Sequence, residues 1–255
     1  MDDRARIDAV LDGLPNLTVA VSGGVDSLTL AHLAARRWGT VRAVHAVSPA
    51  VPASATARVR SEAEAGGWTL LVVEAGEFAD PDYLRNPLNR CYFCKSNLYR
   101  RIAEAVAGPV AAGTNLDDLG EYRPGLDAAG ERGVRHPFVE ARLDKASVRA
   151  LARSLRLAEV AELPAQPCLA SRVETGIPID ARDLAFIDRV ETAVRTLAGG
   201  DVRCRITARG VRLELSQDPP PGIDALLARL CADEGRPLAG IAPYKRGSAF
   251  LGAPK

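Results

Sequence analysis

The N-terminal part of the chain alternates short apolar runs with segments of helical spacing, and this alternation constrains the fold more than any other feature. The apolar runs predict buried strands at residues 17–21, 41–47, 69–73 and 109–114. The helical spacing predicts helices at residues 2–14, 25–37, 56–65, 95–107 and 144–155. Strands that alternate with helices in this way form a parallel, doubly wound sheet. We therefore expect an α/β domain over residues 1–163.

A different pattern follows residue 163. Two segments of alternating polar and apolar residues, 202–207 and 211–216, flank a short turn and predict two strands. Helices are predicted before and after them, at residues 180–197 and 222–232. We expect a smaller α+β domain over residues 164–255. Between residues 115 and 137 there is no clean period, which predicts an active-site loop.

Size and charge argue against several classes of function. The formal net charge of +1 over 255 residues provides no global field for a nucleic acid or a membrane surface. No apolar run approaches the ~20 residues that a membrane helix needs, and the N-terminus is acidic, unlike a secretory signal. We therefore expect a cytoplasmic protein with no membrane partner and no nucleic-acid partner. Five cysteines, an odd number, fit poorly with a disulfide framework and point to thiol chemistry or metal binding.

The motif SGGVDS stands directly after the first predicted strand and before a helix. Gly23 and Gly24 allow a tight turn whose backbone N–H groups, together with the helix N-terminus, attract an anion. Ser22 and Ser27 supply hydroxyl donors for phosphate oxygens. Asp26 beside phosphates indicates a bound Mg²⁺. The simpler interpretation is a glycine turn followed by a helix cap.

This glycine loop is neither a Walker A motif, because no G-K-[ST] follows, nor a Rossmann G-x-G-x-x-G. It resembles the PP-loop, S-G-G-x-D-S, of the ATP pyrophosphatase superfamily. The resemblance implies that ATP is bound and cleaved between its α- and β-phosphates, and that AMP is transferred to a substrate oxygen. It also implies that the loop holds the departing pyrophosphate.

Three cysteines lie in motifs of their own. Cys91 and Cys94 form a C-x-x-C, and Cys168 stands four residues before Arg172. A cysteine near a guanidinium group is a usable nucleophile or metal ligand. Three thiolates can hold a [4Fe–4S] cluster and leave one iron open for exogenous sulfide. A zinc site would need a fourth ligand, such as His136, and a buried loop cysteine is the simpler interpretation of Cys168.

The combination of SGGVDS, NRCYFCKSNLY, GTNLDDLGEYRPG and PCLASR resembles the LarE family of ATP-dependent sulfur transferases. The resemblance implies a role in synthesis of the nickel-pincer nucleotide. The implied substrate is pyridinium-3,5-biscarboxylic acid mononucleotide, whose carboxylates are adenylated and then exchanged for thiocarboxylates. The implied partners are a sulfur donor (sulfide or a desulfurase), a downstream nickel-inserting protein and further copies of the chain.

Two versions of the sulfur step occur in this family. In one, the cysteine that corresponds to Cys168 gives up its own sulfur and becomes dehydroalanine. In the other, three cysteines hold a [4Fe–4S] cluster that carries an extra sulfide. Because the chain has all three cysteines, we expect the cluster version, with Cys91, Cys94 and Cys168 as ligands. Asp26, Cys168 and Arg172 are the expected catalytic residues.

The same resemblance implies that residues 164–255 serve substrate binding, sulfur transfer and assembly, and it assigns further residues to binding. The segment after the fourth predicted strand is expected along the ATP site and contributes Gly113, Asp117 and Arg123. The residues expected around the substrate phosphate are Ser171, Arg172, Glu191, Arg203, Arg205 and Glu214. Two arginines on one face of a strand suit bidentate phosphate recognition. Salt bridges with a purely structural role are the alternative.

Three other functions compete with sulfur transfer to a carboxylate. A cluster-dependent tRNA thiolation enzyme would activate a base carbonyl and would need an RNA-binding surface, whereas aromatic residues make up only 5% of this chain. An amide-forming ligase of the NAD- or GMP-synthetase kind would use ammonia and would not need three placed cysteines. A non-catalytic nucleotide-binding module would not need the serines and the aspartate of the glycine loop.

Overall fold

The computed structural model describes residues 2–120 and 122–245, which divide into two compact units. The first unit comprises residues up to 48, 53–80 and 89–166. The second comprises residues 49–52, 81–88 and those from 167 onward. The predicted boundary between residues 163 and 164 stays a prediction, and residues 246–255 of the predicted second domain lie outside the described residues.

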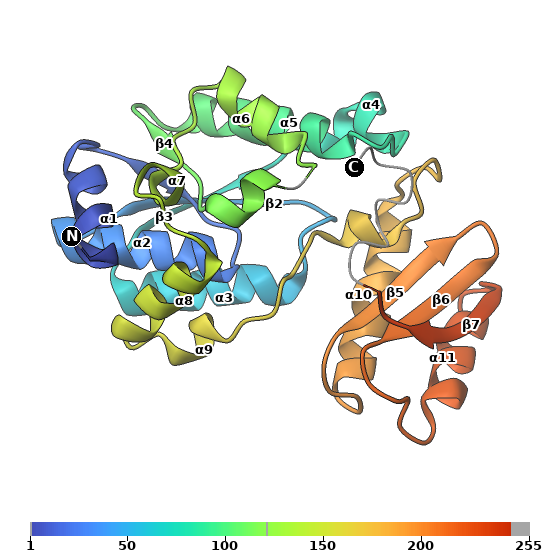
Figure 1. Cartoon of the computed structure of the whole chain (residues 1–255). Helices are drawn as coiled ribbons and strands as arrows, with labels where there is room; N and C mark the ends of the chain where they lie inside the picture. Colours follow the sequence, from blue (N-terminus) through green and yellow to red (C-terminus); the bar gives the residue numbers. More distant parts are fainter. Residues whose placement is uncertain (1, 121, 246–255) are drawn as a thin grey trace. The chain divides into compact units, whose positions relative to one another are not determined.

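The first unit contains the predicted parallel sheet (Figure 1). Its strands are β1 (Thr18–Ala20), β2 (Arg42–Val47), β3 (Thr69–Glu74) and β4 (Val110–Ala111). They run in the order β3-β2-β1-β4, and every pair is parallel. Strand β1 therefore lies between β2 and β4, where the chain order of the sheet reverses. Open α/β sheets bind ligands beyond the carboxyl ends of their strands at such a reversal.

Helices cover both faces of this sheet (Figure 1). The longer ones are α1 (Asp3–Asp12), α2 (Val25–Trp38), α3 (Ala53–Gly66), α5 (Arg90–Ala105) and α8 (Lys145–Ser154). The short ones are η1 (Glu77–Ala79), η2 (Leu116–Gly120), α6 (Gly125–Glu131), α7 (Pro137–Glu140) and α9 (Ala158–Ala161). Ala43 belongs to the core beneath α2, while its neighbour Val44 packs with Ile102 of α5. Successive strand residues thus face opposite helical layers, as the period of a strand requires.

Two sequence-based expectations for this unit were wrong in detail. The segment between residues 115 and 137 is not a continuous loop, because it contains η2 and α6. Helix α6 has the sequence GLDAAGE, and it buries only Ala128 and Ala129. Such small side chains produce no apolar period that a pattern search detects. Helix α5 begins at Arg90 instead of residue 95, so the C-x-x-C lies within the helix.

The second unit is built on a small mixed sheet. Strands β5 (Val202–Thr207) and β6 (Gly210–Leu215) are antiparallel, as predicted, and β7 (Leu238–Pro243) pairs parallel to β6. The sequence did not predict β7, whose residues LAGIAP include a glycine and a proline. The helices are α4 (Pro81–Leu84), η3 (Leu169–Arg172), α10 (Ala181–Arg195) and α11 (Ile223–Ala232). The predicted α/β fold with a smaller α+β region is confirmed.

Asn86 explains why residues 81–88 belong to the second unit. Its side chain is fully buried, and Nδ2 donates to the carbonyl oxygens of Glu174 and Ile177 at 2.9 Å each. The Ile179 amide also donates to the Leu84 carbonyl oxygen at 2.8 Å. These hydrogen bonds hold the segment against the chain that follows η3.

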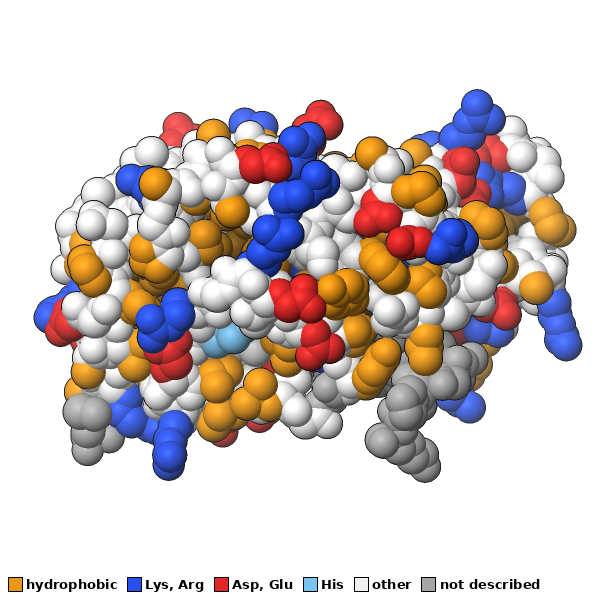
Figure 2. Space-filling model, turned by 90° about the horizontal axis from the view of Figure 1, so that it is seen from above, with side chains coloured by type: hydrophobic (Ala, Val, Ile, Leu, Met, Phe, Trp, Pro, Cys, Tyr) orange, Lys and Arg blue, Asp and Glu red, His pale blue; other side chains and the backbone are white. Residues whose placement is uncertain are grey.

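On the face seen from above, Figure 2 shows basic and acidic side chains next to one another. In residues 2–120 and 122–245, no helix combines the length and hydropathy that a membrane span requires.

Candidate active site

The glycine loop follows β1 and begins α2, as its sequence predicts. Gly24 is the N-cap residue of α2, and as a glycine it contributes no side-chain cap to this end of the helix. Ser27 Oγ accepts a hydrogen bond from the Ser22 amide at 3.1 Å and donates one to the Gly24 carbonyl oxygen. It also lies 3.2 Å from Ser22 Oγ. Ser27 is buried, whereas Ser22 is exposed. The loop is therefore held by its serines and leaves the first N–H groups of α2 for an anion.

Asp26 connects the glycine loop to two segments from far along the chain. Its carboxylate accepts from Lys145 Nζ at 2.5 Å and from Asn115 Nδ2 at 3.2 Å. Lys145 is the first residue of α8, and Asn115 is buried just beyond β4. The sequence motif predicts Mg²⁺ beside Asp26, but it does not predict either of these two partners. The arrangement brings a carboxylate and an ammonium group together at the carboxyl edge of the sheet.

The acidic residues after β4 hold this edge together. Asp117 Oδ2 accepts a hydrogen bond from the Lys145 backbone amide at 3.3 Å, and the Asp117 backbone amide donates to Asn115 Oδ1 at 3.1 Å. Asp118 accepts from the Asn115 amide at 3.0 Å and forms an ion pair with Arg123 at 2.7 Å. These contacts give Asp117 and Arg123 structural partners, and their expected roles at ATP stay predictions.

Two glycines fix where the segment after β4 runs. A Cβ on Gly113 would lie 2.7 Å from the Ser27 nitrogen and 2.8 Å from the Asp26 carbonyl carbon. A Cβ on Gly125 would lie 2.9 Å from Lys95 Cγ and 3.3 Å from the carbonyl oxygen of Cys91. Neither position has room for a side chain. The motif that begins at Gly113 therefore packs on the glycine loop at one end and on the cysteine-bearing helix at the other, where α6 lies beside α5 (Figure 1).

The cysteines occupy two different settings. Cys91 and Cys94 lie three residues apart in the first turns of α5, which places them on one side of the helix, and both are partly exposed. Cys168 is the N-cap residue of η3 in the second unit and is also partly exposed. Within either unit, the described residues contain no group of three or more His, Cys, Asp or Glu side chains gathered as metal ligands. The three-cysteine ligand set stays a prediction.

Cys204 and Cys231 differ from these three, because both are buried. Burial raises the pKa of the Cys204 thiol far above its ordinary value, and the charge of Glu191 raises it further. Burial also raises the pKa of Cys231. Both thiols therefore pack in the core, as the sequence analysis expected.

Arg172 and Glu191 form the centre of a buried ionic cluster in the second unit. Arg172 donates from Nε and Nη2 to the two carboxylate oxygens of Glu191, at 2.9 and 3.1 Å, and both side chains are almost fully buried. Arg172 Nη1 donates to the backbone oxygens of Pro167 (2.6 Å) and Cys168 (3.1 Å) and to Ser171 Oγ (3.0 Å). Arg172 thus contacts the backbone that carries Cys168 at two carbonyl oxygens.

The ionisation of Glu191 follows from these partners. Burial alone would raise the pKa of this carboxyl group, but the hydrogen bonds and charge of Arg172 hold the pKa below its ordinary value. Arg195 Nη2 and the Cys204 amide also donate to the same carboxylate, at 2.5 and 3.0 Å. Glu191 is therefore a buried anion in a fully hydrogen-bonded setting.

The arginines of β5 extend this cluster. Arg205 Nε donates to Glu214 Oε2 on β6 at 2.6 Å, and its Nη1 donates to the Ser171 carbonyl oxygen at 3.1 Å. Arg203 donates to Asp201 at 3.0 Å and lies over the ring of Tyr244, 5.3 Å from its centroid. Burial lowers the pKa of Arg203, and the nearby charge of Arg172 lowers it further.

The predicted substrate-phosphate residues therefore come together in one unit. Among the described residues, the ion pairs of this cluster join five guanidinium groups to three carboxylates: Arg172, Arg195, Arg203, Arg205 and Arg212 with Glu191, Asp201 and Glu214. The guanidinium charge in these pairs exceeds the carboxylate charge, which favours an additional anion. Arg195, Arg212 and Tyr244 were not predicted from the sequence.

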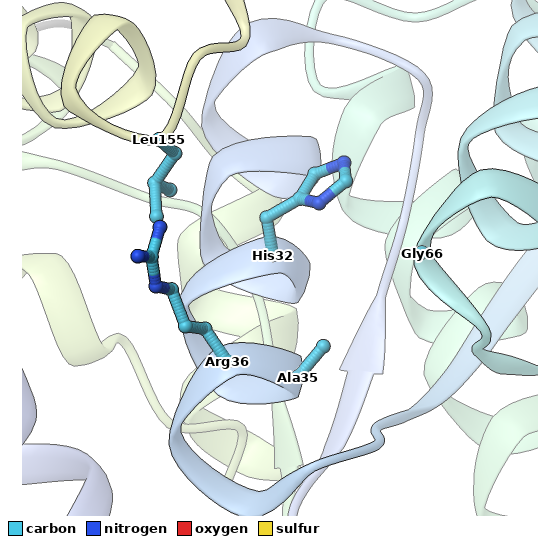
Figure 3. A pocket seen from close by; sticks show the side chains of 5 residues that line it. All are labelled: His32, Ala35, Arg36, Gly66 and Leu155. Atoms are coloured by element: carbon cyan, nitrogen blue, oxygen red, sulfur yellow. The ribbon is translucent and has the colours of Figure 1, made fainter.

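A hollow elsewhere on the first unit does not belong to this site. His32, Ala35, Arg36, Gly66 and Leu155 line it, and Figure 3 shows Arg36 extending toward Leu155 while the His32 ring turns to the other side. His32 Nε2 lies 2.8 Å from Glu62 Oε2, and its ring meets Trp68 edge-on at 4.7 Å. His32, Ala35 and Arg36 follow the glycine loop along α2 by about two to three helical turns. Local packing and the His32–Glu62 hydrogen bond account for these residues.

No model of a known protein family matches the chain. Over 215 residues it is 39% identical to an uncharacterized protein of Synechocystis, covering 82% of this chain and 79% of that protein. It is 27% identical over 206 residues to an uncharacterized protein of Methanocaldococcus jannaschii, covering 79% and 78%. It is 30% identical over 220 residues to the pyridinium-3,5-bisthiocarboxylic acid mononucleotide synthase of Lactiplantibacillus plantarum, covering 84% of this chain and 79% of that enzyme.

Proposed function

The chain belongs to the LarE family, that of the pyridinium-3,5-bisthiocarboxylic acid mononucleotide synthases, and we propose that it is an ATP-dependent sulfur transferase of nickel-pincer cofactor synthesis. In this proposal it adenylates the carboxylates of pyridinium-3,5-biscarboxylic acid mononucleotide and converts them to thiocarboxylates. The 30% identity with the Lactiplantibacillus synthase over most of both chains is the observation that carries the proposal.

The first step of the proposed reaction activates a carboxylate. A carboxylate oxygen attacks the α-phosphorus of ATP, pyrophosphate leaves, and the acid becomes an acyl-adenylate with AMP as its leaving group. The uncapped N-terminus of α2 and the hydroxyl of Ser22 are suited to hold the phosphates that leave. Asp26 would bind Mg²⁺, and Lys145 would neutralise the charge of the departing pyrophosphate.

The second step exchanges oxygen for sulfur. A sulfide attacks the acyl carbon, and AMP leaves with the original carboxylate oxygen, so one carbon–oxygen bond is replaced by one carbon–sulfur bond. When bound, a [4Fe–4S] cluster on Cys91, Cys94 and Cys168 would supply an iron with an open position for that sulfide. The donor set fits such a cluster, since thiolates are its usual protein ligands and two of them share one side of α5.

The arginine cluster of the second unit is proposed to bind the phosphate of the pyridinium nucleotide. Arg203 and Arg205 are nearly buried and already oriented by Asp201, Tyr244 and Glu214. A preorganised guanidinium group loses little side-chain entropy when it binds a phosphate. Arg172 joins this cluster to the backbone of Cys168, so the proposed phosphate site and the proposed sulfur site share one side chain.

We also propose protein partners and a cellular compartment for the chain. The sulfur donor would be sulfide or a desulfurase, and a downstream protein would insert nickel into the product. We further propose that the chain acts in the cytoplasm and assembles with copies of itself. Neither a membrane nor a nucleic acid is needed for this chemistry.

Two measurements on anaerobically purified protein test the proposal. Pyrophosphate release is expected only when ATP, Mg²⁺ and the pyridinium dicarboxylate are all present. Release that does not depend on the dicarboxylate would contradict the assignment of the substrate. Iron and acid-labile sulfide analysis should give about four iron atoms per chain, as expected for one [4Fe–4S] cluster. Dehydroalanine at Cys168 after turnover, without iron, would instead establish the sacrificial route.

A further inference from the structure

Arg58 of α3 links the glycine loop to the segment that leads to Cys168. Its Nη1 donates to the Gly23 carbonyl oxygen at 2.8 Å and to Gln166 Oε1 at 3.2 Å. Gln166 is the last residue of the first unit, and Pro167 and Cys168 follow it directly. Helix α3 also packs closely on the loop, because the Ala55 carbonyl oxygen lies 2.8 Å from where a Cβ on Gly23 would be.

Both acceptors of Arg58 are neutral, although Arg58 carries a charge. Among the described residues, no carboxylate lies within ion-pair distance of its guanidinium group, and the charge of Glu62 acts only from farther away. Burial lowers the pKa of Arg58, which reflects the cost of removing this cation from water without a close counter-ion. A half-buried guanidinium group in this setting favours an anion.

The N–H donors of the Arg58 guanidinium group can bind the two protein oxygens and a phosphate at the same time. The two hydrogens of Nη1 account for the bonds to Gly23 and Gln166. The Nε and Nη2 hydrogens remain for a second acceptor, and a guanidinium group presents these two donors side by side to a phosphate. The proposed function places phosphates at the N-terminus of α2, and this helix begins at Val25, two residues after Gly23.

We propose that Arg58 is a positioning residue that binds a phosphate oxygen of ATP or pyrophosphate at the glycine loop and thereby fixes Gln166 and the Pro167–Cys168 segment. The inference rests on the proposed ATP site and adds a coupling to it. A phosphate that holds the guanidinium group of Arg58 in place also holds Gln166 Oε1, which accepts a hydrogen bond from that group. Occupancy of the phosphate site would thus order the backbone next to the sulfur-transfer cysteine.

The test uses inorganic pyrophosphate as the probe and the full chain, purified anaerobically. Calorimetry measures pyrophosphate affinity, and hydrogen exchange with mass spectrometry follows the peptide that contains residues 166–168. In the wild type, pyrophosphate should slow exchange in this peptide. Arg58→Gln should weaken pyrophosphate binding by about ten- to a hundredfold, the range for a charged hydrogen bond, and should abolish the protection at saturating pyrophosphate.

Gln166→Ala separates the two parts of the inference, because it removes the link without removing the guanidinium group. This variant should bind pyrophosphate within about twofold of the wild type, because Gln166 is exposed and its side chain is not expected to contact the phosphate, but it should lose the protection. Arg60→Gln on the same helix is the matched control, because Arg60 is exposed, and it should behave as the wild type in both measurements.

The outcomes distinguish this inference from the proposed function. Unchanged pyrophosphate affinity in Arg58→Gln, or full protection in Gln166→Ala, would overturn the inference and leave the ATP site intact. A wild-type chain that binds neither pyrophosphate nor ATP would overturn the proposed ATP site itself, and this inference with it.

Discussion

The carboxylate of Asp26 and the ammonium group of Lys145 are 2.5 Å apart, although 119 positions separate them in the sequence. The pair lies beside the glycine loop, where the proposed reaction releases pyrophosphate. Lys145→Gln should lower the rate of pyrophosphate release by about 10²- to 10³-fold, the usual effect of losing one preorganised electrostatic group. Steady-state assays with ATP and the dicarboxylate measure it.

Arg153→Gln is the control for this substitution, because Arg153 lies on the same helix but pairs with the exposed Glu162. It should retain wild-type activity. A fully active Lys145→Gln variant would show that the Asp26–Lys145 pair serves structure alone.

The thiols should divide into two classes. Cys91, Cys94 and Cys168 are partly exposed, whereas Cys204 and Cys231 are buried, with pKa values that burial raises. In iron-free native protein, an alkylating reagent should therefore modify the first three much faster than the last two. Peptide mass spectrometry after timed quenching gives each rate, and all five should react in denaturant. Rapid native modification of Cys204 would contradict its placement in the core.

Glu191→Gln should strongly destabilise the second unit. The substitution removes the charge that compensates the buried Arg172, and breaking a buried pair typically costs about 3–5 kcal/mol. Urea denaturation measures this loss. Glu162→Gln removes the exposed partner of Arg153 and should cost less than about 1 kcal/mol. Equal effects of the two substitutions would show that the buried cluster carries no special stability.

The pH dependence of the same cluster has a definite sign. Arg172 holds the pKa of Glu191 below its ordinary value of 4.5, so the unfolded chain takes up the proton first as the pH falls. The stability that this carboxylate contributes is present above pH 4.5 and is lost as the pH falls through the lower pKa of the folded state. Glu191→Gln should abolish this part of the acid sensitivity.

The buried carboxyl group of Glu77 should give the protein's stability the opposite pH dependence. Its side chain is almost fully buried, and its Oε2 has no hydrogen-bond partner among the described residues. Burial raises the pKa of this carboxyl group, against the smaller effects of a hydrogen bond from Ser48 and the charge of Lys95. The unfolded chain then loses the proton first as the pH rises, so stability falls above the ordinary value of 4.5.

Glu77→Gln should therefore raise the melting temperature at pH 8, by about 2–4 °C for each kcal/mol gained at this chain length. The difference from the wild type should shrink as the pH falls toward 4.5. The exposed Glu64→Gln serves as the control and should show no such trend. A Glu77→Gln variant that is less stable than the wild type at pH 8 would show that the ionised carboxylate has a stabilising partner.

The strands and the main helices followed from the sequence because their signals are local. Apolar runs before a glycine or polar segment identified β1, β2 and β3, and the cap of α8 at Asp144 was confirmed by its bond to the Ser147 amide. Helix α6 and strand β7 were missed, because alanines, glycines and a proline give no periodic apolar pattern.

The candidate site was only partly predictable for a similar reason. The glycine loop and the arginines of β5 stand in short motifs, so sequence alone identified them. Lys145, Asn115 and Arg58 reach the glycine loop from other elements, and their roles appear only when the sheet brings those elements together. Gln166 is similar, since nothing in its sequence context indicates a partner on α3.

Mass spectrometry of the pyridinium nucleotide shows whether the chain moves sulfur onto an ATP-activated carboxylate. Anaerobic protein with a bound cluster is incubated with ATP, Mg²⁺, isotopically labelled sulfide and the dicarboxylate. We expect nucleotide in which labelled sulfur has replaced a carboxylate oxygen, in amounts that exceed the enzyme and match the AMP released. Nucleotide that stays a dicarboxylate or becomes an amide, while AMP accumulates, would rule out sulfur transfer as the reaction of this chain.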